Sequence, residues 1–310
     1  MRHILTLTAI ALLAIGSAVP PAPAATKVNL LYIPGGDFVP SFVAKDQGIF
    51  ERHGLDVDMS IAQNGSVISA ALAADQAQIG VPTPPVLLQA NEQGLDLVIV
   101  AGATVLPFPK NAAGVIAREG SNLKGPQDLV GHKVGVPGIG AALHVLFRYY
   151  LLENKVDFHK VDFAETLLPR MRDLLAAKTV DAVVAVNPFI GQITGSGAGY
   201  LAVALAGQIP SGKPVIMYVT TREWAEQHKA ELAAFRAGIF DGAKFVVAEP
   251  DRTKEDANRY AKLPPQVLKA AELSDQVPNI NTDDLAWWFG VMKQQGMLTH
   301  DLDMKKLLYP

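Results

Sequence analysis

Cysteine is absent from all 310 residues of the chain. Its absence excludes disulfide bonds, cysteine nucleophiles and thiolate metal sites, and also the lipid-bearing cysteine that tethers some exported proteins to a membrane. A chain of this length can build a stable core without covalent cross-links. A cysteine-free exported protein of this size therefore fits the bacterial periplasm.

Basic blocks and clustered histidines are also missing. The chain has 27 Lys and Arg against 30 Asp and Glu, and no stretch concentrates the positive charge that nucleic acids bind, so nucleic acid is not predicted as a partner. The 7 histidines show no metal-ligand spacing, and we predict no metal site. Beyond the N-terminus, no apolar run approaches the roughly twenty residues that span a bilayer.

The N-terminal segment has the three parts of a secretory signal peptide. Arg2 and His3 supply a basic start, residues 4–19 form an apolar run, and an A-x-A cleavage site ends at Ala24. The apolar run is short for a membrane span. We therefore predict that residues 1–24 are removed on export and that the mature protein is a periplasmic monomer.

After this segment, short apolar runs alternate with amphipathic stretches, which is typical of an α/β fold with parallel strands. The alternation of predicted strands and helices is interrupted at the proline-containing residues 106–109 and then resumes. The C-terminal part of the chain is predicted to be helical. We predict two α/β lobes joined by two crossing segments near residues 103–117 and 205–220. Lobe 1 is predicted to comprise residues 25–112 and 214–310, and lobe 2 residues 113–213.

The individual elements follow from the same periodicity. The strands are predicted at residues 28–33, 55–59, 79–81, 97–101, 114–117, 133–136, 161–163, 181–186 and 215–220. The helices before residue 220 are predicted at residues 41–47, 67–74, 86–93, 123–129, 141–153 and 169–177. Ser66 is the predicted N-cap of the second of these helices.

Four segments of the chain match motifs that occur together in one family. Residues 44–57, AKDQGIFERHGLDV, follow the pattern A-x-x-x-G-(aromatic or apolar)-F-x-x-x-G-L-D-V, and residues 65–80 follow G-S … A-L-A-x-G-x-x-D-I-G. Residues 180–189 follow D-A-x-x … E-P, and residues 221–228 match a further segment. The chain thus resembles substrate-binding proteins of the nitrate/sulfonate/taurine type, a group that includes binders of thiamine pyrimidine precursors.

The resemblance implies a type II periplasmic-binding-protein fold, in which two lobes close over one small-molecule ligand. It also implies a partner, the membrane permease of an ABC importer. Three residues depart from the pattern: Asp75 and Gln78 replace the usual Gly and Asp, and Asn187 replaces Glu. Some of these departures lie in or beside the expected ligand loops, so the identity of the ligand is left open.

The candidate ligand-binding residues lie where strands lead into helix N-termini. At such junctions an open α/β sheet binds ligands, and the free N–H groups of the helix attract polar oxygens. Simple turn or capping roles are alternatives for several of them. The candidates are Gly36, Asp37, Phe38, Asn64, Ser66, Thr83, Gly138, Ile139, Gly140, Ala141, Asn187 and Phe189.

Asp37 and two aromatic residues bear on the ligand class. Asp37 either caps a helix or faces an amine or ring N–H of the ligand, and its charge would repel a bare oxyanion such as nitrate. Phe38 and Phe189 could each stack on a planar ligand. A sulfonate or taurine-like zwitterion and a small aromatic acid or pyrimidine both fit this set.

Two glycine motifs resemble those of nucleotide-dependent enzymes, but each lacks one residue that the nucleotide site requires. Residues 207–213 match G-x-x-x-x-G-K, but Pro214 stands where a P-loop needs Ser or Thr. Residues 138–143 resemble a dinucleotide fingerprint, but Leu143 occupies the third glycine position. We predict a binding protein without catalysis or cofactor. The alternatives are a binder of a thiamine pyrimidine precursor and, second, a dinucleotide-dependent exported enzyme.

Overall fold

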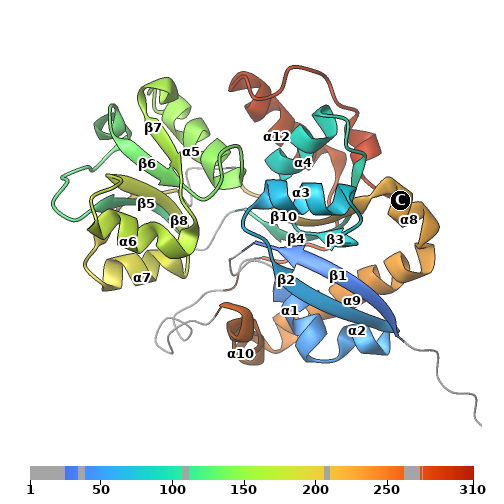
Figure 1. Ribbon diagram of the computed structural model, residues 1–310. Coiled ribbons are helices and arrows are strands. Elements are labelled where there is room, and N and C mark those ends of the chain that lie inside the picture. The colour runs from blue at the N-terminus through green and yellow to red at the C-terminus, as the bar shows by residue number, and fades with distance from the viewer. Residues whose placement is uncertain (1–24, 34–38, 107–111, 206–209, 262–272, 274) are drawn as a thin grey trace, which may run out of the picture.

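The computed structural model describes residues 25–33, 39–106, 112–205, 210–261, 273 and 275–310. These residues form two five-stranded sheets with helices packed on them, and the sheets lie side by side in Figure 1. We call the sheet that contains both early and late strands, with its helices, lobe 1, and the other lobe 2. The residue boundaries predicted for the lobes remain a prediction.

The sheet of lobe 1 has the order β2-β1-β3-β10-β4. Strand β1 is parallel to β2 and β3, whereas β10 runs antiparallel to β3 and β4. Strand β4 is buried along nearly its whole length, as expected of a continuous apolar run covered on both faces. The strands are β1 Thr26–Tyr32, β2 Leu55–Ile61, β3 Ile79–Gly80, β4 Leu97–Val105 and β10 Pro214–Thr221.

The sheet of lobe 2 repeats this design, with the order β7-β6-β8-β5-β9. Strand β6 is parallel to β7 and β8, whereas β5 runs antiparallel to β8 and β9. The strands are β5 Ala113–Arg118, β6 Lys133–Val136, β7 Asp162–Glu165, β8 Ala182–Val186 and β9 Gly199–Ala204.

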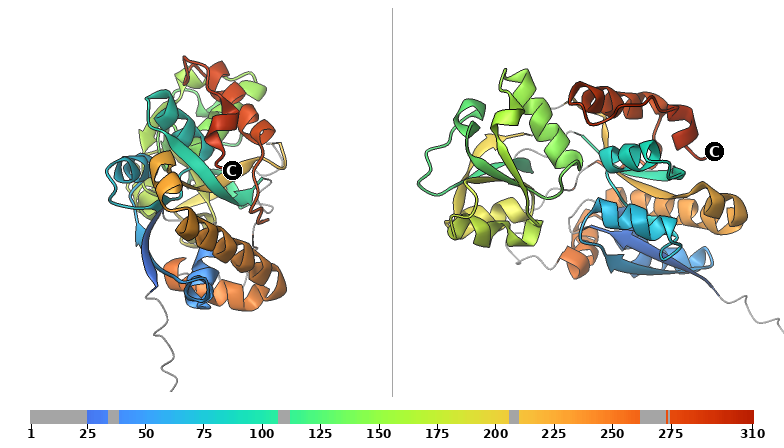
Figure 2. Two further views of the ribbon diagram at one scale, coloured as in Figure 1. Left: turned by 90° about the vertical axis from the view of Figure 1, so that its right-hand side faces the viewer. Right: turned by 45° about the horizontal axis from the view of Figure 1, so that its top comes forward.

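The helices cover the faces of both sheets (Figures 1 and 2). Those of lobe 1 are α1 Val39–Asp46, α2 Ile49–Arg52, α3 Gly65–Ala73, α4 Pro84–Glu92, α8 Arg222–Gln227, α9 Lys229–Ala248, α10 Pro250–Ala261 and α12 Thr282–Gln294. Those of lobe 2 are α5 Ala142–Glu153, α6 Met171–Ala176 and α7 Phe189–Gly195. Short 3₁₀ turns are η1 Pro126–Leu129, η2 Phe158–Lys160, η3 Leu168–Arg170 and η4 Met304–Leu307.

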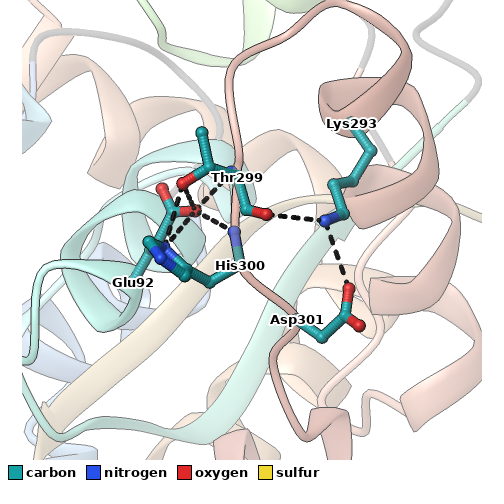
Figure 3. Close-up of polar contacts among 5 residues, drawn as sticks. All are labelled: Glu92, Lys293, Thr299, His300 and Asp301. Carbon is teal, nitrogen blue, oxygen red and sulfur yellow. Dashed lines mark hydrogen bonds and ion pairs between the residues drawn. The ribbon is translucent and has the colours of Figure 1, made fainter.

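The C-terminal segment ties the lobes together on one side. Helix α12 packs on α4 of its own lobe and also lies beside α5 of lobe 2 in both views (Figures 1 and 2). The carboxylate of Glu92, at the end of α4, accepts hydrogen bonds from the backbone N–H groups of Thr299 and His300 (Figure 3). These bonds fasten the loop after α12 to lobe 1.

The observed elements differ from the sequence-based expectation in several places, and helices α2 and α7 were not predicted. Strand β9 was not predicted, although its sequence GYLAVA is mostly apolar. The predicted helix 123–129 is wrong: only the 3₁₀ turn η1 forms there, begun by Pro126. Helix α3 is capped by Asn64 and not by Ser66, because the Asn64 side chain accepts the Val67 N–H.

No helix in the described ranges has both the length and the apolar character needed to cross a membrane.

Candidate functional site

A cavity of about 230 Å³ lies between the two lobes, and both contribute to its wall. Lobe 1 supplies the ends of β1 and β2, the starts of α3 and α4, and two residues of β10. Lobe 2 supplies the loop between β6 and α5, the segment after β7, and the end of β8. The lining residues are Ile33, Ile61, Ala62, Gln63, Asn64, Gly65, Thr83, Pro137, Gly138, Ala141, Ala142, Leu143, Leu167, Leu168, Pro169, Val186, Val215 and Ile216.

The strand directions place the cavity here. Ile61 is the last residue of β2, Pro137 directly follows β6, and Val186 ends β8. In open α/β sheets the carboxyl ends of parallel strands form the edge where ligands bind. The two lobes present these edges to each other, so the cavity is enclosed by loops from both.

The wall of the cavity is mostly apolar. Among the described lining residues, polar side chains come from Gln63, Asn64 and Thr83, and no lining residue is charged. The mouth is apolar as well, since the lining residues Ile61 and Leu167 are 58% and 37% exposed. Exposed apolar surface of this kind marks a place where another molecule is received.

Asn64 joins the lobes across the cavity. Its side-chain oxygen accepts the Val67 N–H at 3.1 Å and caps α3. Its side-chain nitrogen donates to one carboxylate oxygen of Glu165, at the end of β7 in lobe 2, at 3.1 Å. The second oxygen of Glu165 accepts the Ile139 N–H at 3.1 Å. One carboxylate thus holds both the start of α3 and the loop before α5.

Thr83 makes a second link between the lobes. It is the N-cap residue of α4, but its side chain makes no capping bond to that helix, whose first two positions are Pro84 and Pro85 without N–H groups. The buried Thr83 hydroxyl oxygen instead accepts the Ala142 N–H, at the first position of α5, at 3.2 Å. The side chain therefore caps a helix of the opposite lobe.

Gly140 and His144 complete the loop before α5. Gly140 has a φ of +82°, which favours glycine, and a Cβ there would lie 3.0 Å from Oε1 of Gln89 on α4. The Gly140 N–H donates to Nδ1 of the buried His144 at 2.9 Å. Burial, and then the charge of Arg148, lowers the pKa of His144 to about 4, so the ring is neutral and Nδ1 accepts.

The amides at the start of α5 are consequently in use within the protein. The N–H groups of Ile139, Gly140 and Ala142 donate to Glu165, His144 and Thr83. The remaining one, of Ala141, donates to the carbonyl oxygen of Gly138 at 3.1 Å. Four consecutive amides at a helix start, the usual donors to an anion, therefore donate to acceptors of the protein.

The structure places the predicted site residues in three groups, and whether any of them binds ligand stays a prediction. Those that line the cavity are Asn64, Thr83, Gly138 and Ala141. Those that are described but do not line it are Ser66, Ile139, Gly140, Asn187 and Phe189. Those outside the described residues are Gly36, Asp37 and Phe38.

Sequence analysis missed several residues of the site. Leu167, Leu168 and Ile216 line the cavity, but an apolar residue at a strand end gives the same sequence signal as a core residue. Glu165 was missed because the predicted strand stopped at residue 163, and its partner Asn64 is 101 positions away. A carboxylate directly after a strand was the one available signal.

No cluster of three or more His, Asp or Glu side chains able to hold a metal ion occurs within the described ranges.

Comparison with known proteins assigns the chain to a family. A family model described as NMT1/THI5 like matches residues 36–253. A curated binding protein of Brucella abortus (strain 2308) is 24% identical over 226 residues, which are 71% of this chain and 67% of the relative. A Haemophilus influenzae protein named for thiamine biosynthesis is 30% identical over 151 residues, 48% of this chain and 45% of the relative.

The fold is shared with a solved structure of the same architecture. The alkanesulfonate-binding protein SsuA from Xanthomonas axonopodis pv. citri, bound to MOPS, has a TM-score of 0.80 at 16% identity. The match covers 93% of this chain and 99% of that chain. The predicted α/β fold of the type II periplasmic-binding-protein class, with two lobes, is confirmed.

Proposed function

The chain belongs to the NMT1/THI5-like family, and from this premise we propose that it is the periplasmic solute-binding component of an ABC importer. It captures a small organic molecule between its two lobes and presents it to a membrane permease. The lobes close by a hinge through the two crossing segments, and the protein catalyses no reaction. The proposal includes export with removal of residues 1–24 and function as a monomer.

The observation that carries this proposal is the cavity, whose wall is divided between the lobes. A ligand held there contacts lobe 1 and lobe 2 at once, so it stabilises the closed arrangement over any open one. Hinge closure around a ligand is a standard transition of two-lobed binding proteins. The links from Asn64 to Glu165 and from Thr83 to Ala142 are available only when the lobes meet.

The relatives support the same class of function. The Brucella abortus relative is named as a binding protein, and the structural neighbour SsuA is named as an alkanesulfonate-binding protein. The ligand classes compatible with the sequence are a sulfonate or taurine-like compound and a small aromatic acid. We carry both into the test below.

A second candidate is a binder of a thiamine pyrimidine precursor. It is favoured by the Haemophilus influenzae relative, whose name refers to thiamine biosynthesis, and by the family description. That match covers less than half of either chain.

The test uses the purified mature protein, residues 25–310. Thermal unfolding is measured with sulfonates, nitrate, aromatic acids, pyrimidines and dinucleotides, because a ligand that binds only the folded state raises Tm. We expect one small organic class to raise Tm and to reduce the radius of gyration in small-angle X-ray scattering. A rise with dinucleotides alone would contradict the proposal. Mass spectrometry of the protein from a periplasmic fraction checks cleavage near Ala24.

A further inference from the structure

We infer that the captured molecule is uncharged and mainly apolar, a small alkyl or aryl compound with one hydrogen-bond acceptor, rather than a sulfonate or another anion. This inference rests on the proposed function and narrows its ligand class. It departs from the sulfonate, taurine-like and aromatic-acid ligands that the sequence left open, and it is carried by four features of the cavity.

The first feature is the absence of a cationic partner. Among the described residues that line the cavity, none is Lys, Arg or His. The sequence around the end of β1 adds none, because no basic residue occurs between Lys27 and Lys45. An anion enclosed here would lose its hydration without gaining a counter-charge, which is strongly unfavourable.

The second feature is that the helix starts around the cavity offer few free donors. At α5, the amides of residues 139–142 already donate to acceptors of the protein. At α4, Pro84 and Pro85 have no N–H groups. At α3, the Asn64 side chain occupies the Val67 N–H. Backbone N–H groups, the usual substitute for a basic side chain, are therefore taken up by protein acceptors at α5, absent from the first two positions of α4 and partly taken up at α3.

The third feature is a negative charge beside the cavity. Both carboxylate oxygens of Glu165 are held, one by Asn64 and the other by the Ile139 N–H. Asn64 itself lines the cavity, so the carboxylate, which is exposed and partly screened by water, lies one hydrogen bond from the wall. Its field opposes an anionic ligand and leaves an uncharged one unaffected.

The fourth feature is the Thr83 hydroxyl: of the three polar side chains in the described wall, from Gln63, Asn64 and Thr83, that of Thr83 is buried and supplies a polar anchor. Thr83 lines the cavity and is 6% exposed. Its oxygen accepts from Ala142, and no hydrogen bond among the described residues uses Thr83 as the donor. A hydroxyl can accept and donate at once, so its proton remains for one acceptor atom of the ligand.

The decisive experiment compares matched neutral and anionic ligands on the mature protein. Binding of linear alcohols from butan-1-ol to octan-1-ol, of cyclohexanol and of benzyl alcohol is measured by calorimetry and thermal shift. The alkane- and benzenesulfonates of the same carbon skeletons, nitrate and 4-aminopyrimidine are measured alongside. We expect the alcohols to bind, with affinity rising about fourfold per added methylene, equivalent to about 0.8 kcal/mol, until the cavity is full.

The outcomes separate this inference from the proposed function. Sulfonates that bind as tightly as the matching alcohols overturn the inference and leave the solute-binding function standing. Binding of aminopyrimidine alone overturns the inference and favours the second candidate. Failure of every ligand class to bind overturns both.

A variant pair tests the anchor. Thr83→Val also removes the link to Ala142, so it should weaken both ligands, but benzyl alcohol about fivefold to tenfold more than toluene, which has no acceptor. Thr179→Val, an exposed threonine of lobe 2 outside the cavity wall, is the matched control and should change neither. Equal losses for toluene and benzyl alcohol in Thr83→Val would contradict the anchoring role.

Discussion

The side-chain amide of Gln295 donates a hydrogen bond to the carbonyl oxygen of Val145 at 3.0 Å, and this bond joins the end of α12 in lobe 1 to α5 in lobe 2. The backbone carbonyl of Gln295 accepts a second bond, from the Arg148 guanidinium at 2.9 Å. Tyr149 and Trp287 add an edge-to-face ring contact between the same helices. The lobes are thus linked away from the cavity as well as across it.

The buried hydrogen bond from Gln295 to Val145 predicts that Gln295→Ala lowers the stability of the fold. The change removes the bond to Val145 and leaves space at a 5%-exposed position, so we expect the free energy of unfolding to fall by about 1–2 kcal/mol. Denaturant unfolding measures this loss. Gln294→Ala, at the exposed neighbouring position, is the control and should be nearly neutral. Equal effects of the two changes would contradict a specific role for Gln295.

Asn64 has two separable roles, and two substitutions distinguish them. Asn64→Ala removes the cap of α3 and should cost about 1 kcal/mol of stability, whereas Asn64→Asp keeps the cap. Asn64→Asp, however, places a second carboxylate against Glu165, and like charges at this distance repel. We expect the Asp variant to unfold nearly as the wild type does but to show a larger radius of gyration in small-angle scattering at neutral pH. An unchanged radius would argue that the bond to Glu165 does not hold the lobes together.

The sequence predicted the two-lobed fold because that information is local. Continuous apolar runs such as residues 97–101 and 182–186 lie inside strands β4 and β8, and turns with glycine or proline separate the repeats. Strand β9, which pairs antiparallel with β5, was missed although its residues are mostly apolar.

The sequence predicted those residues of the candidate site whose position depends on neighbouring residues in the chain. The rule that ligands lie at strand-to-helix junctions led to Asn64, Thr83, Gly138 and Ala141, which line the cavity. The bond from Thr83 to Ala142 joins residues 59 positions apart, and no local pattern reports such a pairing. The use of the α5 amides by protein acceptors likewise depends on how the lobes meet.

Glu92 predicts a loss of stability in acid. The N–H groups of His300 and Thr299 hydrogen-bond its carboxylate and lower the pKa of Glu92 below its ordinary value (Figure 3). The folded state therefore binds this proton less tightly than the unfolded state does. The stabilisation is complete above the ordinary glutamate pKa and is lost as pH falls through the lower folded value. The stability difference between wild type and Glu92→Gln, measured by urea unfolding from pH 7 to pH 3, should shrink as the pH falls, and a constant difference would refute this role.

His144 predicts a second dependence on pH, in a different window. Burial and the nearby Arg148 lower the pKa of His144 to about 4 from its ordinary value of 6.5. Between these two pH values the imidazole is protonated in the unfolded chain and neutral in the folded chain. Stability is full above pH 6.5 and falls as the pH drops towards 4, by roughly 3 kcal/mol over the window. Protonation would also remove the Nδ1 acceptor of the Gly140 N–H and so loosen the loop before α5. His144→Gln cannot titrate, and its unfolding free energy, measured by urea titration between pH 7.5 and pH 4, should lose this share of the slope whatever its absolute stability. Parallel pH profiles for the wild type and the variant would show that His144 does not titrate in this window.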